Sequence, residues 1–274
     1  MTGITVKTSL GLSKELLMLK VLCLDIENFP CEVWSWSIGE VHLPLEFLKK
    51  DWSVCAWAAH WLGDPASKIV YMDNRKRRDI YDDKRLIKEL VKMMNQADVI
   101  IGQNVEKFDI RKLASRAEFH GLKPFRPVKI TDILTEERRV FALTSHKLAH
   151  KTERNVTYRK LEHKEYPGFD LWKACMRDEK RAWEVMEEYC KHDVLSTEER
   201  YLKVAPWIRT HALGPIDGVM RCKCGSTNLK KEGFAYGDAS KFQIYSCNDC
   251  GKWPRSPINL LTKTQKQSRL REAM

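Results

Sequence analysis

The chain has 274 residues, of which 43% are hydrophobic and 31% are charged. This composition supports a packed core and excludes a chain that is disordered throughout. The formal net charge is +11. The sequence has no apolar run of about 18 residues and no recognisable secretory leader, so we expect an intracellular protein without a membrane-spanning helix.

Hydrophobic patterning predicts a mixed α/β fold. Strands are expected at 20–27, 31–39 and 52–61, with a fourth strand, or an extension of the third, at 68–72. Further along, we expect a helix at 82–97, a strand at 98–102, a helix at 108–119, and a long helix or helix pair at 179–202. This order predicts one mixed sheet with helices on its faces. The stretch 144–175 is weakly patterned and yields no prediction.

Charge is distributed unevenly along the chain. Residues 206–274 contain 12 basic and 5 acidic side chains, a net of +7, whereas residues 1–205 have a net of +4. We predict a main domain at 1–205, a linker with Pro and Gly at 206–219, a cysteine module at 220–254 and a basic tail at 255–274. The basic excess favours a polyanion partner, normally nucleic acid, although a basic tail can also serve solubility.

Three groups of polar residues are candidates for chemistry. Asp25 and Glu27 stand two residues apart on the first strand, so both side chains project from one face. Two adjacent carboxylates repel unless a cation lies between them, and Mg²⁺ or Mn²⁺ prefers such oxygens. Asp109 lies at a helix start, and Tyr189 and Asp193 share a helix face. Taken singly, each group also fits a strand end in solvent, a helix cap or an ordinary helix surface.

Taken together, the three motifs are more specific. Asp-x-Glu, Asn-x-x-x-Phe-Asp and Tyr-x-x-x-Asp, in this order, resemble the DEDD 3′–5′ exonucleases of the RNase H-like fold, in the subclass with tyrosine in the third motif. The chain is similar to the proofreading domain of B-family DNA polymerases over roughly residues 18–208, with further matches at 131–134, 145–148 and 193–202. The resemblance implies an RNase H-like mixed sheet with flanking helices.

The same resemblance implies roles for the matching residues. Asp25, Glu27, Asp109 and Asp193 would hold two Mg²⁺ or Mn²⁺ ions, and Tyr189 would orient the attacking water. The remaining matches are candidate substrate contacts. Asn104 and Phe108 lie where the family meets the terminal nucleotide, Lys147 where it meets the backbone, and Asn28 and Phe29 where it often has a contacting threonine.

Four of the nine cysteines form two pairs, each followed by Gly. Cys222 and Cys224 form Cys-x-Cys-Gly, and 22 residues separate them from Cys247 and Cys250 in Cys-x-x-Cys-Gly. Four thiolates at such spacing predict one structural Zn²⁺, although one residue between the first pair is tighter than usual. Free thiols in a β-hairpin are the alternative. The other five cysteines are expected to be reduced thiols: Cys23, Cys31, Cys55, Cys175 and Cys190.

The cysteine module resembles the zinc ribbons of transposases and other DNA-binding proteins. Its lysines alternate with aromatic residues over 230–236 and 241–245. Basic surfaces with stacking aromatics suit single-stranded nucleic acid, whereas the same aromatics can also form the small core of the ribbon. Both uses remain open at this point.

The resemblance implies a metal-dependent exonuclease that removes nucleotides from DNA 3′ ends, with single strands as the expected substrate. An RNA 3′–5′ exonuclease is one alternative, because the same metal site attacks either backbone. A nucleic-acid-binding protein with an inactive nuclease fold is another, although the chain retains all four acids and Tyr189. We expect the protein in the cytoplasm of a bacterial cell or of a phage-infected host, away from membranes.

Overall fold

A computed structural model describes residues 19–153, 157–158, 164–268 and 270. The described residues divide into two compact units, one spanning Lys20–Arg209 and the other containing the residues from Thr210 onward. Among the helices that the structure describes, none is both long and apolar enough to cross a lipid bilayer.

The larger unit is built on one five-stranded mixed sheet with the order β5-β4-β1-β6-β7. Its strands are β1 (Val21–Phe29), β4 (Ser53–Trp61), β5 (Val70–Asp73), β6 (Val99–Gly102) and β7 (Lys129–Asp132). β6 pairs in parallel with both β1 and β7, whereas β4 pairs antiparallel with β1 and β5. β4 therefore runs opposite to the other four strands.

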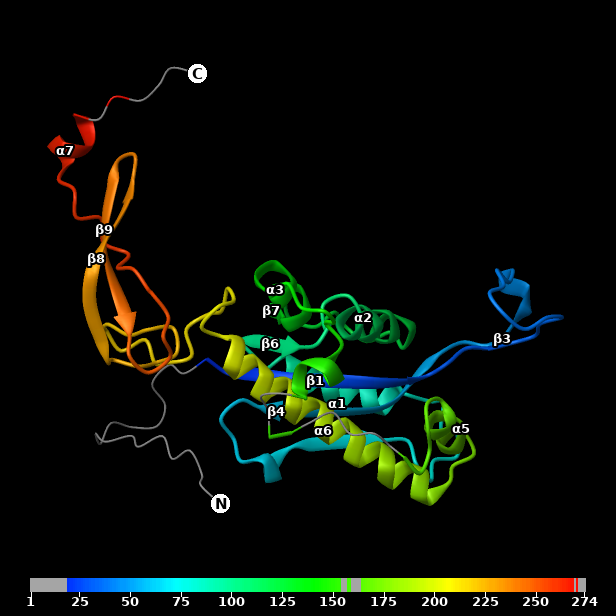
Figure 1. The fold of residues 1–274 in the computed structure, drawn as a ribbon. Coiled ribbons are helices and arrows are strands. Elements are labelled where there is room, and N and C mark those ends of the chain that lie inside the picture. The colour runs from blue at the N-terminus through cyan, green and yellow to red at the C-terminus, as the bar shows by residue number, and fades with distance from the viewer. Residues whose placement is uncertain (1–18, 154–156, 159–163, 269, 271–274) are drawn as a thin grey trace. The chain divides into compact units, whose positions relative to one another are not determined.

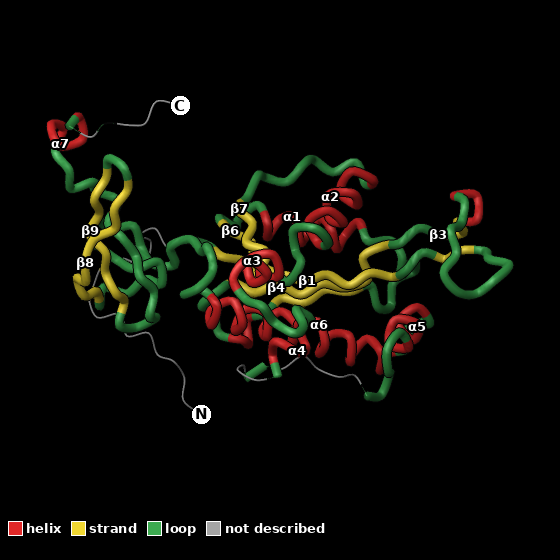
Figure 2. Tube along the Cα trace, turned by 45° about the horizontal axis from the view of Figure 1, so that its top comes forward, coloured by secondary structure: helices red, strands yellow, loops and turns green. Residues whose placement is uncertain are grey.

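In the described part of the chain, six helices accompany this sheet: α1 (Lys84–Met94), α2 (Asp109–Phe119), α3 (Ile133–Val140), α4 (Leu148–Thr152), α5 (Asp170–Met176) and α6 (Lys180–Val204). Some pack on its two faces, whereas α4 and α5 pack on α6 (Figure 2). α1 and α2 lie on one side, and the 25-residue α6 crosses the other (Figure 1). α1 forms because its apolar residues recur at helical spacing, which buries one stripe against the sheet.

The alternation of β1 divides its side chains between the two faces. Leu22, Leu24 and Ile26 are buried in the main hydrophobic cluster with residues of α1 and α2. Cys23 points to the opposite face, where its thiol donates a hydrogen bond to the carbonyl of Val194 on α6 at 3.5 Å. Since side chains alternate along a strand, the odd-numbered residues of β1 face α6.

The smaller unit contains one antiparallel hairpin, β8 (Leu229–Gly237) and β9 (Ser240–Cys247), and a short helix, α7 (Lys263–Gln267). Residues beyond 254 remain attached to this hairpin. The Ser256 amide donates to the Gln243 carbonyl at 2.8 Å, and the Leu260 amide donates to the Lys241 carbonyl at 2.8 Å. The ribbon-like packing therefore continues to about residue 260 before α7.

The predicted fold class is confirmed. A central mixed sheet carries helices on its faces, and a small unit holds the clustered cysteines. The predicted helices at 82–97, 108–119 and 179–202 correspond to α1, α2 and a single continuous α6. The unassigned stretch 144–175 contains α4 and α5, with 154–156 and 159–163 outside the described residues.

The predicted strand at 31–39 is wrong. Only Glu32–Val33 forms a strand, β2, and its partner is the three-residue β3 (Leu48–Lys50). The segment extends away from the sheet in Figure 1, and Trp36 is 96% exposed. Its β-branched and aromatic residues favour a strand locally, but an isolated two-stranded ribbon has too few partners to continue one.

Candidate active site and candidate zinc centre

The predicted acidic residues meet where β1 faces α6. Asp25 and Glu27 lie on the odd-numbered face of β1, the same face as Cys23. The pairing of β1 with β4 shifts register between Glu27 and Asn28. Such a bulge bends a strand and changes where its side chains point, and bulges are common beside functional sites. Both carboxylates therefore stand just before an irregular end of β1.

Asp109 joins this pair from the first turn of α2. Its Oδ1 accepts a hydrogen bond from the Ile26 amide at 3.0 Å, which fixes the carboxylate against the middle of β1. The residue is only 2% exposed. Burial and the negative charge of Asp25 raise the pKa of Asp109 well above its usual value. A buried acid beside another acid is a position that a bound cation would stabilise.

α6 supplies the remaining two residues from its buried face. Asp193 and Tyr189 are one helical turn apart and are 5% and 7% exposed. Burial raises the pKa of the Tyr189 hydroxyl, and the negative charges of Asp193, Glu27 and Asp25 raise it further. The structure thus brings the side chain of Tyr189 within electrostatic reach of three of the four predicted acids.

The donor set fits hard divalent cations. Asp25, Glu27, Asp109 and Asp193 supply only carboxylate oxygens, the ligands that Mg²⁺ and Mn²⁺ prefer. Among the described residues, it is the four cysteines, not these acids, that have ligand atoms all within 4.8 Å of one another.

A pocket of about 510 Å³ opens beside Glu27, within the size range of small-ligand sites. Its lining includes Asn28, Phe29, Trp52, Phe108, Lys112, Phe169 and Trp172. The ring of Trp172 meets that of Tyr189 edge to face, with centroids 6.1 Å apart, so the pocket adjoins the acidic residues. Lys112 Nζ lies 3.8 Å from the centroid of Trp52 and 5.0 Å from that of Phe108. The pocket therefore presents aromatic faces and one cation.

The predicted substrate contacts lie in different places. Asn28, Phe29 and Phe108 line the pocket. Phe108 is 41% exposed, whereas Phe29 is fully buried against Tyr81 and Trp183, where it supports the pocket wall from behind.

Within the described part of the chain, the buried Oδ1 of Asn28 has no hydrogen-bond partner. Asn104 and Lys147 are not among the pocket-lining residues.

Asn104 instead shapes the turn that precedes Asp109. Its φ of 61° is left-handed, a conformation that Asn tolerates better than most residues. Asp132, at the end of β7, accepts hydrogen bonds from the amides of Asn104 and Glu106, each at 3.2 Å. In the same turn, a Cβ added to Gly102 would lie 2.7 Å from Cβ of Val105. The turn is therefore fixed by the carboxylate of Asp132 and by the close approach of Val105 to Gly102.

Sequence reasoning missed several of these residues. Asp132 belongs to a matched motif, but its link to the turn appears only when β6 and β7 pair. Trp52, Lys112 and Trp172 come from three distant segments, and no local pattern connects them. The one available signal was the spacing of Phe108 and Lys112, which are four residues apart at the start of α2 and therefore lie on one helix face.

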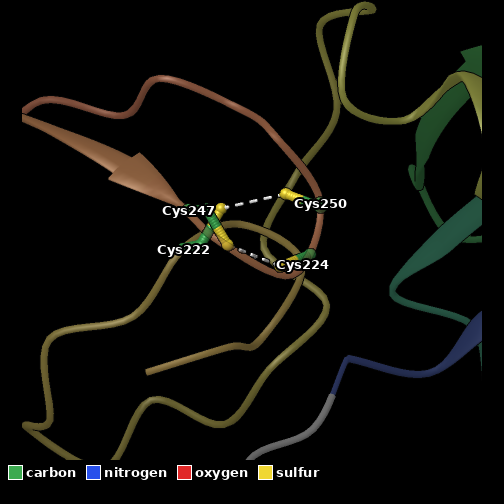
Figure 3. Close-up of side chains that lie close together, drawn as sticks. All are labelled: Cys222, Cys224, Cys247 and Cys250. Carbon is green, nitrogen blue, oxygen red and sulfur yellow. Dashed lines mark hydrogen bonds between the residues drawn. The ribbon is translucent and has the colours of Figure 1, made fainter. Parts of the chain in front are cut away.

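The four clustered cysteines form a second candidate site (Figure 3). The Sγ atoms of Cys222 and Cys250 are 3.6 Å apart, and those of Cys224 and Cys247 are 3.7 Å apart. Tetrahedral zinc with Zn–S bonds of about 2.3 Å requires sulfurs about 3.8 Å apart. The four sulfurs therefore fit a zinc ion, including the tight Cys-x-Cys pair.

The backbone around these cysteines supports the same interpretation. The Gly225 amide donates to the Cys222 carbonyl and the Gly251 amide donates to the Cys247 carbonyl, both at 2.8 Å. These glycines have φ of 94° and 72°, which requires glycine for an unstrained turn. Burial raises the pKa of Cys222 and Cys224, whereas amide hydrogen bonds outweigh burial at Cys247 and lower its pKa to about 7. A thiolate is the form that binds metal.

The other five cysteines are free thiols, of which Cys31 is exposed and Cys23, Cys55, Cys175 and Cys190 are buried. Burial raises the pKa of Cys190, and the charges of Glu27 and Asp25 raise it further, so this thiol stays protonated beside the acidic residues.

No protein-family model matches the chain, and no curated protein matches it. Among solved structures, the chain is similar to the family B DNA polymerase from the hyperthermophilic archaeon Pyrobaculum calidifontis, with 18% identity and a TM-score of 0.45. The match covers 69% of this chain and 25% of the polymerase, so the chain spans about a quarter of that protein's length. This is a coarse likeness.

Proposed function

We propose that the protein is a metal-dependent 3′–5′ exonuclease that hydrolyses DNA from its 3′ end, in the cytoplasm of a bacterial cell or a phage-infected host. The observation that carries the proposal is the meeting of Asp25, Glu27, Asp109 and Tyr189 from three elements at one end of β1. Asp193 adds the fourth carboxylate from α6. Burial and the charge of Asp25 disfavour the ionised form of Asp109, and a bound cation would stabilise that form.

In this proposal, Asp25, Glu27, Asp109 and Asp193 hold two Mg²⁺ or Mn²⁺ ions. When bound, such ions activate a water and neutralise charge on the scissile phosphate and the departing 3′ oxygen. The hydrogen bond from the Ile26 amide holds the carboxylate of Asp109 beside β1, next to the proposed ion sites. The hydroxyl of Tyr189, with its pKa raised by the acids, remains protonated and can donate a hydrogen bond to orient the water.

The aromatic pocket supports a frayed or single-stranded 3′ end as the substrate. Trp52 and Phe108 offer faces on which a base can stack, and Lys112 offers a positive charge for a phosphate. A base inside a duplex is stacked on both faces and cannot enter such a pocket without leaving the helix. We therefore propose that Asn28 and Phe108 contact the terminal nucleotide.

The cysteine unit completes the proposal. One structural Zn²⁺ on Cys222, Cys224, Cys247 and Cys250 would hold together a unit too small to fold on its core alone. The net charge of +7 on residues 206–274 supports a role in holding nucleic acid. We propose residues 1–205 as the nuclease and 206–219 as a linker, as predicted. We propose that the ribbon runs from 220 to about 260, beyond the predicted limit of 254, because the amides of Ser256 and Leu260 donate to β9, and that the remaining residues form the tail.

A polarity assay tests this function. Single- and double-stranded DNA and RNA, labelled at either end, would be incubated with Mg²⁺, with Mn²⁺ or with EDTA. We expect mononucleotides to be released from the 3′ end of single-stranded DNA, with loss of activity in EDTA. Asp193→Asn should abolish release while binding survives, and Asp170→Asn, which changes an exposed acid on α5, should behave as wild type.

The same assay decides between the alternatives. Preferential release from RNA would favour the RNA exonuclease, because a 2′-hydroxyl is what distinguishes the two backbones. Binding without any release, in wild type as in Asp193→Asn, would favour a nucleic-acid-binding protein on an inactive nuclease fold.

A further inference from the structure

The β8–β9 hairpin presents two aromatic rings and a lysine on one face. Phe234 pairs with Gln243 and Tyr236 pairs with Lys241, and directly paired residues share a face of the sheet. The rings of Phe234 and Tyr236 have centroids 6.3 Å apart. Lys241 Nζ lies 4.0 Å from the centroid of Phe234 and 5.7 Å from that of Tyr236. The three side chains therefore form one small cluster, here called the Phe234 face.

The Phe234 face is exposed, whereas the other hairpin aromatics are covered. Tyr245 is buried, and Phe242 is partly buried beneath the guanidinium of Arg255 at 3.8 Å. Phe234 and Tyr236 are 41% and 69% exposed. The sequence left two uses open for these aromatic residues, and the structure divides them: Tyr245 is buried and Phe242 is covered by Arg255, whereas Phe234 and Tyr236 are exposed.

We propose that the Phe234 face binds unpaired bases of a nucleic acid by stacking. The proposal rests on the proposed nucleic-acid partner, but it does not depend on catalysis. Aromatic rings stack on any base because every base has a π-face, and a lysine beside them attracts the phosphate backbone. The net charge of +7 on residues 206–274 favours a polyanion over a neutral protein surface.

The geometry also favours single strands over duplexes. Phe234 and Tyr236 are two residues apart on one strand, and their rings meet edge to face at an interplanar angle of 60°, so they are not stacked on each other. Two neighbouring bases can each stack on a ring only if the bases are spread apart. Bases in a duplex are held in contact with one another, and their faces are not available.

The test measures binding of the full chain to labelled oligo(dT), oligo(U) and a blunt DNA duplex of equal length, in the absence of Mg²⁺. Phe234→Leu with Tyr236→Leu removes both π-faces but keeps apolar side chains that suit a strand. Phe234→Tyr with Tyr236→Phe keeps both rings and is the matched control. Circular dichroism and zinc content check that each variant remains folded.

We expect the leucine pair to weaken single-strand binding by roughly a hundredfold, about tenfold for each ring, and the control pair to bind as wild type. Duplex binding should change less than about twofold, because it depends on phosphate contacts. Lys241→Ala should reduce the salt slope by roughly one. The two single-stranded oligonucleotides show whether the face prefers DNA or RNA.

Two results would overturn the proposal. Unchanged binding of single strands by the leucine pair would indicate that the face serves another partner, such as a protein. Equal weakening on duplex and single strand would show that the rings do not read unpaired bases. We expect the same variants to degrade a trinucleotide with Mg²⁺ at the rate of wild type. If wild type itself has no nuclease activity, that result contradicts the proposed exonuclease function but not the proposed stacking of bases on the Phe234 face.

Discussion

Tyr189 contacts an aromatic ring and lies close to three acidic side chains. Its ring packs edge to face on Trp172, while its hydroxyl lies in the field of Asp193, Glu27 and Asp25. Burial and these charges raise its pKa, so the hydroxyl cannot act as a base near neutral pH. The residue is therefore suited to position a water and not to remove its proton.

Removing only the hydroxyl tests this role. Tyr189→Phe keeps the ring on Trp172 and should leave substrate affinity unchanged, while turnover falls by roughly a hundredfold because the water is less well oriented. Steady-state kinetics on a labelled single-stranded oligonucleotide measures both quantities. Tyr201→Phe, which changes a buried tyrosine two turns from Asp193 on the same helix, is the control. Full turnover in Tyr189→Phe would contradict the assignment.

Asp132 is predicted to act by holding other residues in place. It accepts the amides of Asn104, Glu106 and Thr135, each at 3.2 Å. Asp132→Ala leaves these donors without their acceptor and should lower the free energy of unfolding by about 1–3 kcal/mol. Turnover should fall as well, since the turn leads into Asp109. Asp132→Asn, which retains one acceptor oxygen, should lie between wild type and alanine in urea unfolding and in kcat/KM. Equal loss in both variants would indicate that the charge matters more than the hydrogen bonds.

At the scale of elements, α6 is tied to the sheet by polar as well as apolar contacts. His60 on β4 lies with Nδ1 2.6 Å from Glu198 on α6 and with Nε2 3.2 Å from the Pro65 carbonyl. Burial disfavours the charged imidazole, but the hydrogen bond to Glu198 and its negative charge outweigh burial and raise the pKa of His60. The folded state therefore favours the protonated ring, which can donate to both partners.

This pair predicts a pH-dependent contribution to stability. Because the pKa of His60 is higher in the folded state, the charged ring stabilises the folded protein. This contribution is fully present below the pKa of histidine in the unfolded chain, about 6.5, and it is lost as the pH rises through the pKa of His60 in the folded protein. His60→Gln should therefore cost about 1–3 kcal/mol at acid pH, and the cost should shrink as pH rises. Urea unfolding of both proteins between about pH 5.5 and 9 measures the difference. A difference that stays constant over this range would mean that His60 is not charged in the folded protein.

A second ion-pair cluster fixes the segment after α3. The buried Lys151 on α4 contacts Glu137 on α3 and donates to Gln103 at 2.7 Å, and Arg200 on α6 donates to Glu137 at 2.6 Å. Gln103 also donates to the carbonyl of His146 at 3.2 Å. These contacts join α3, α4 and α6 to the turn before Asp109, which explains why a weakly patterned stretch of sequence still has a defined place.

At the scale of the whole molecule, the two units differ in what stabilises them. The unit of Lys20–Arg209 has an extensive core, whereas the buried residues of the smaller unit include Cys222 and Cys247, two of the four candidate zinc ligands. A unit of this size gains little from apolar burial alone. We therefore expect the smaller unit to require zinc in order to fold, and the unit of Lys20–Arg209 to fold without it.

Zinc removal tests this difference. Wild type should contain one zinc per chain, and Cys247→Ser or a strong chelator should remove it and unfold the smaller unit. The larger unit should keep its own cooperative thermal transition, because its core lacks these cysteines. Metal analysis and circular dichroism follow the two effects. Cys31→Ser, at an exposed thiol, should retain zinc. A fully folded smaller unit without metal would refute the zinc site.

The sequence alone determined those features that depend on near neighbours. The face shared by Asp25 and Glu27, the single stripe of α1 and the two Cys-Gly turns all follow from spacings of a few residues. The fold class followed from the order of such elements. Residue spacing cannot reveal how far a strand continues, which is why the segment 31–39 was predicted as a strand although it has almost no partner.

Tertiary structure alone decided which side chains meet and which remain exposed. Trp52, Lys112 and Trp172 line one pocket because three separate elements converge there. Phe234 is exposed and Tyr245 buried, although both lie in similar alternating strands of one hairpin. The physical reason is that burial depends on what the rest of the chain packs against a residue, and that information lies far from the residue in sequence.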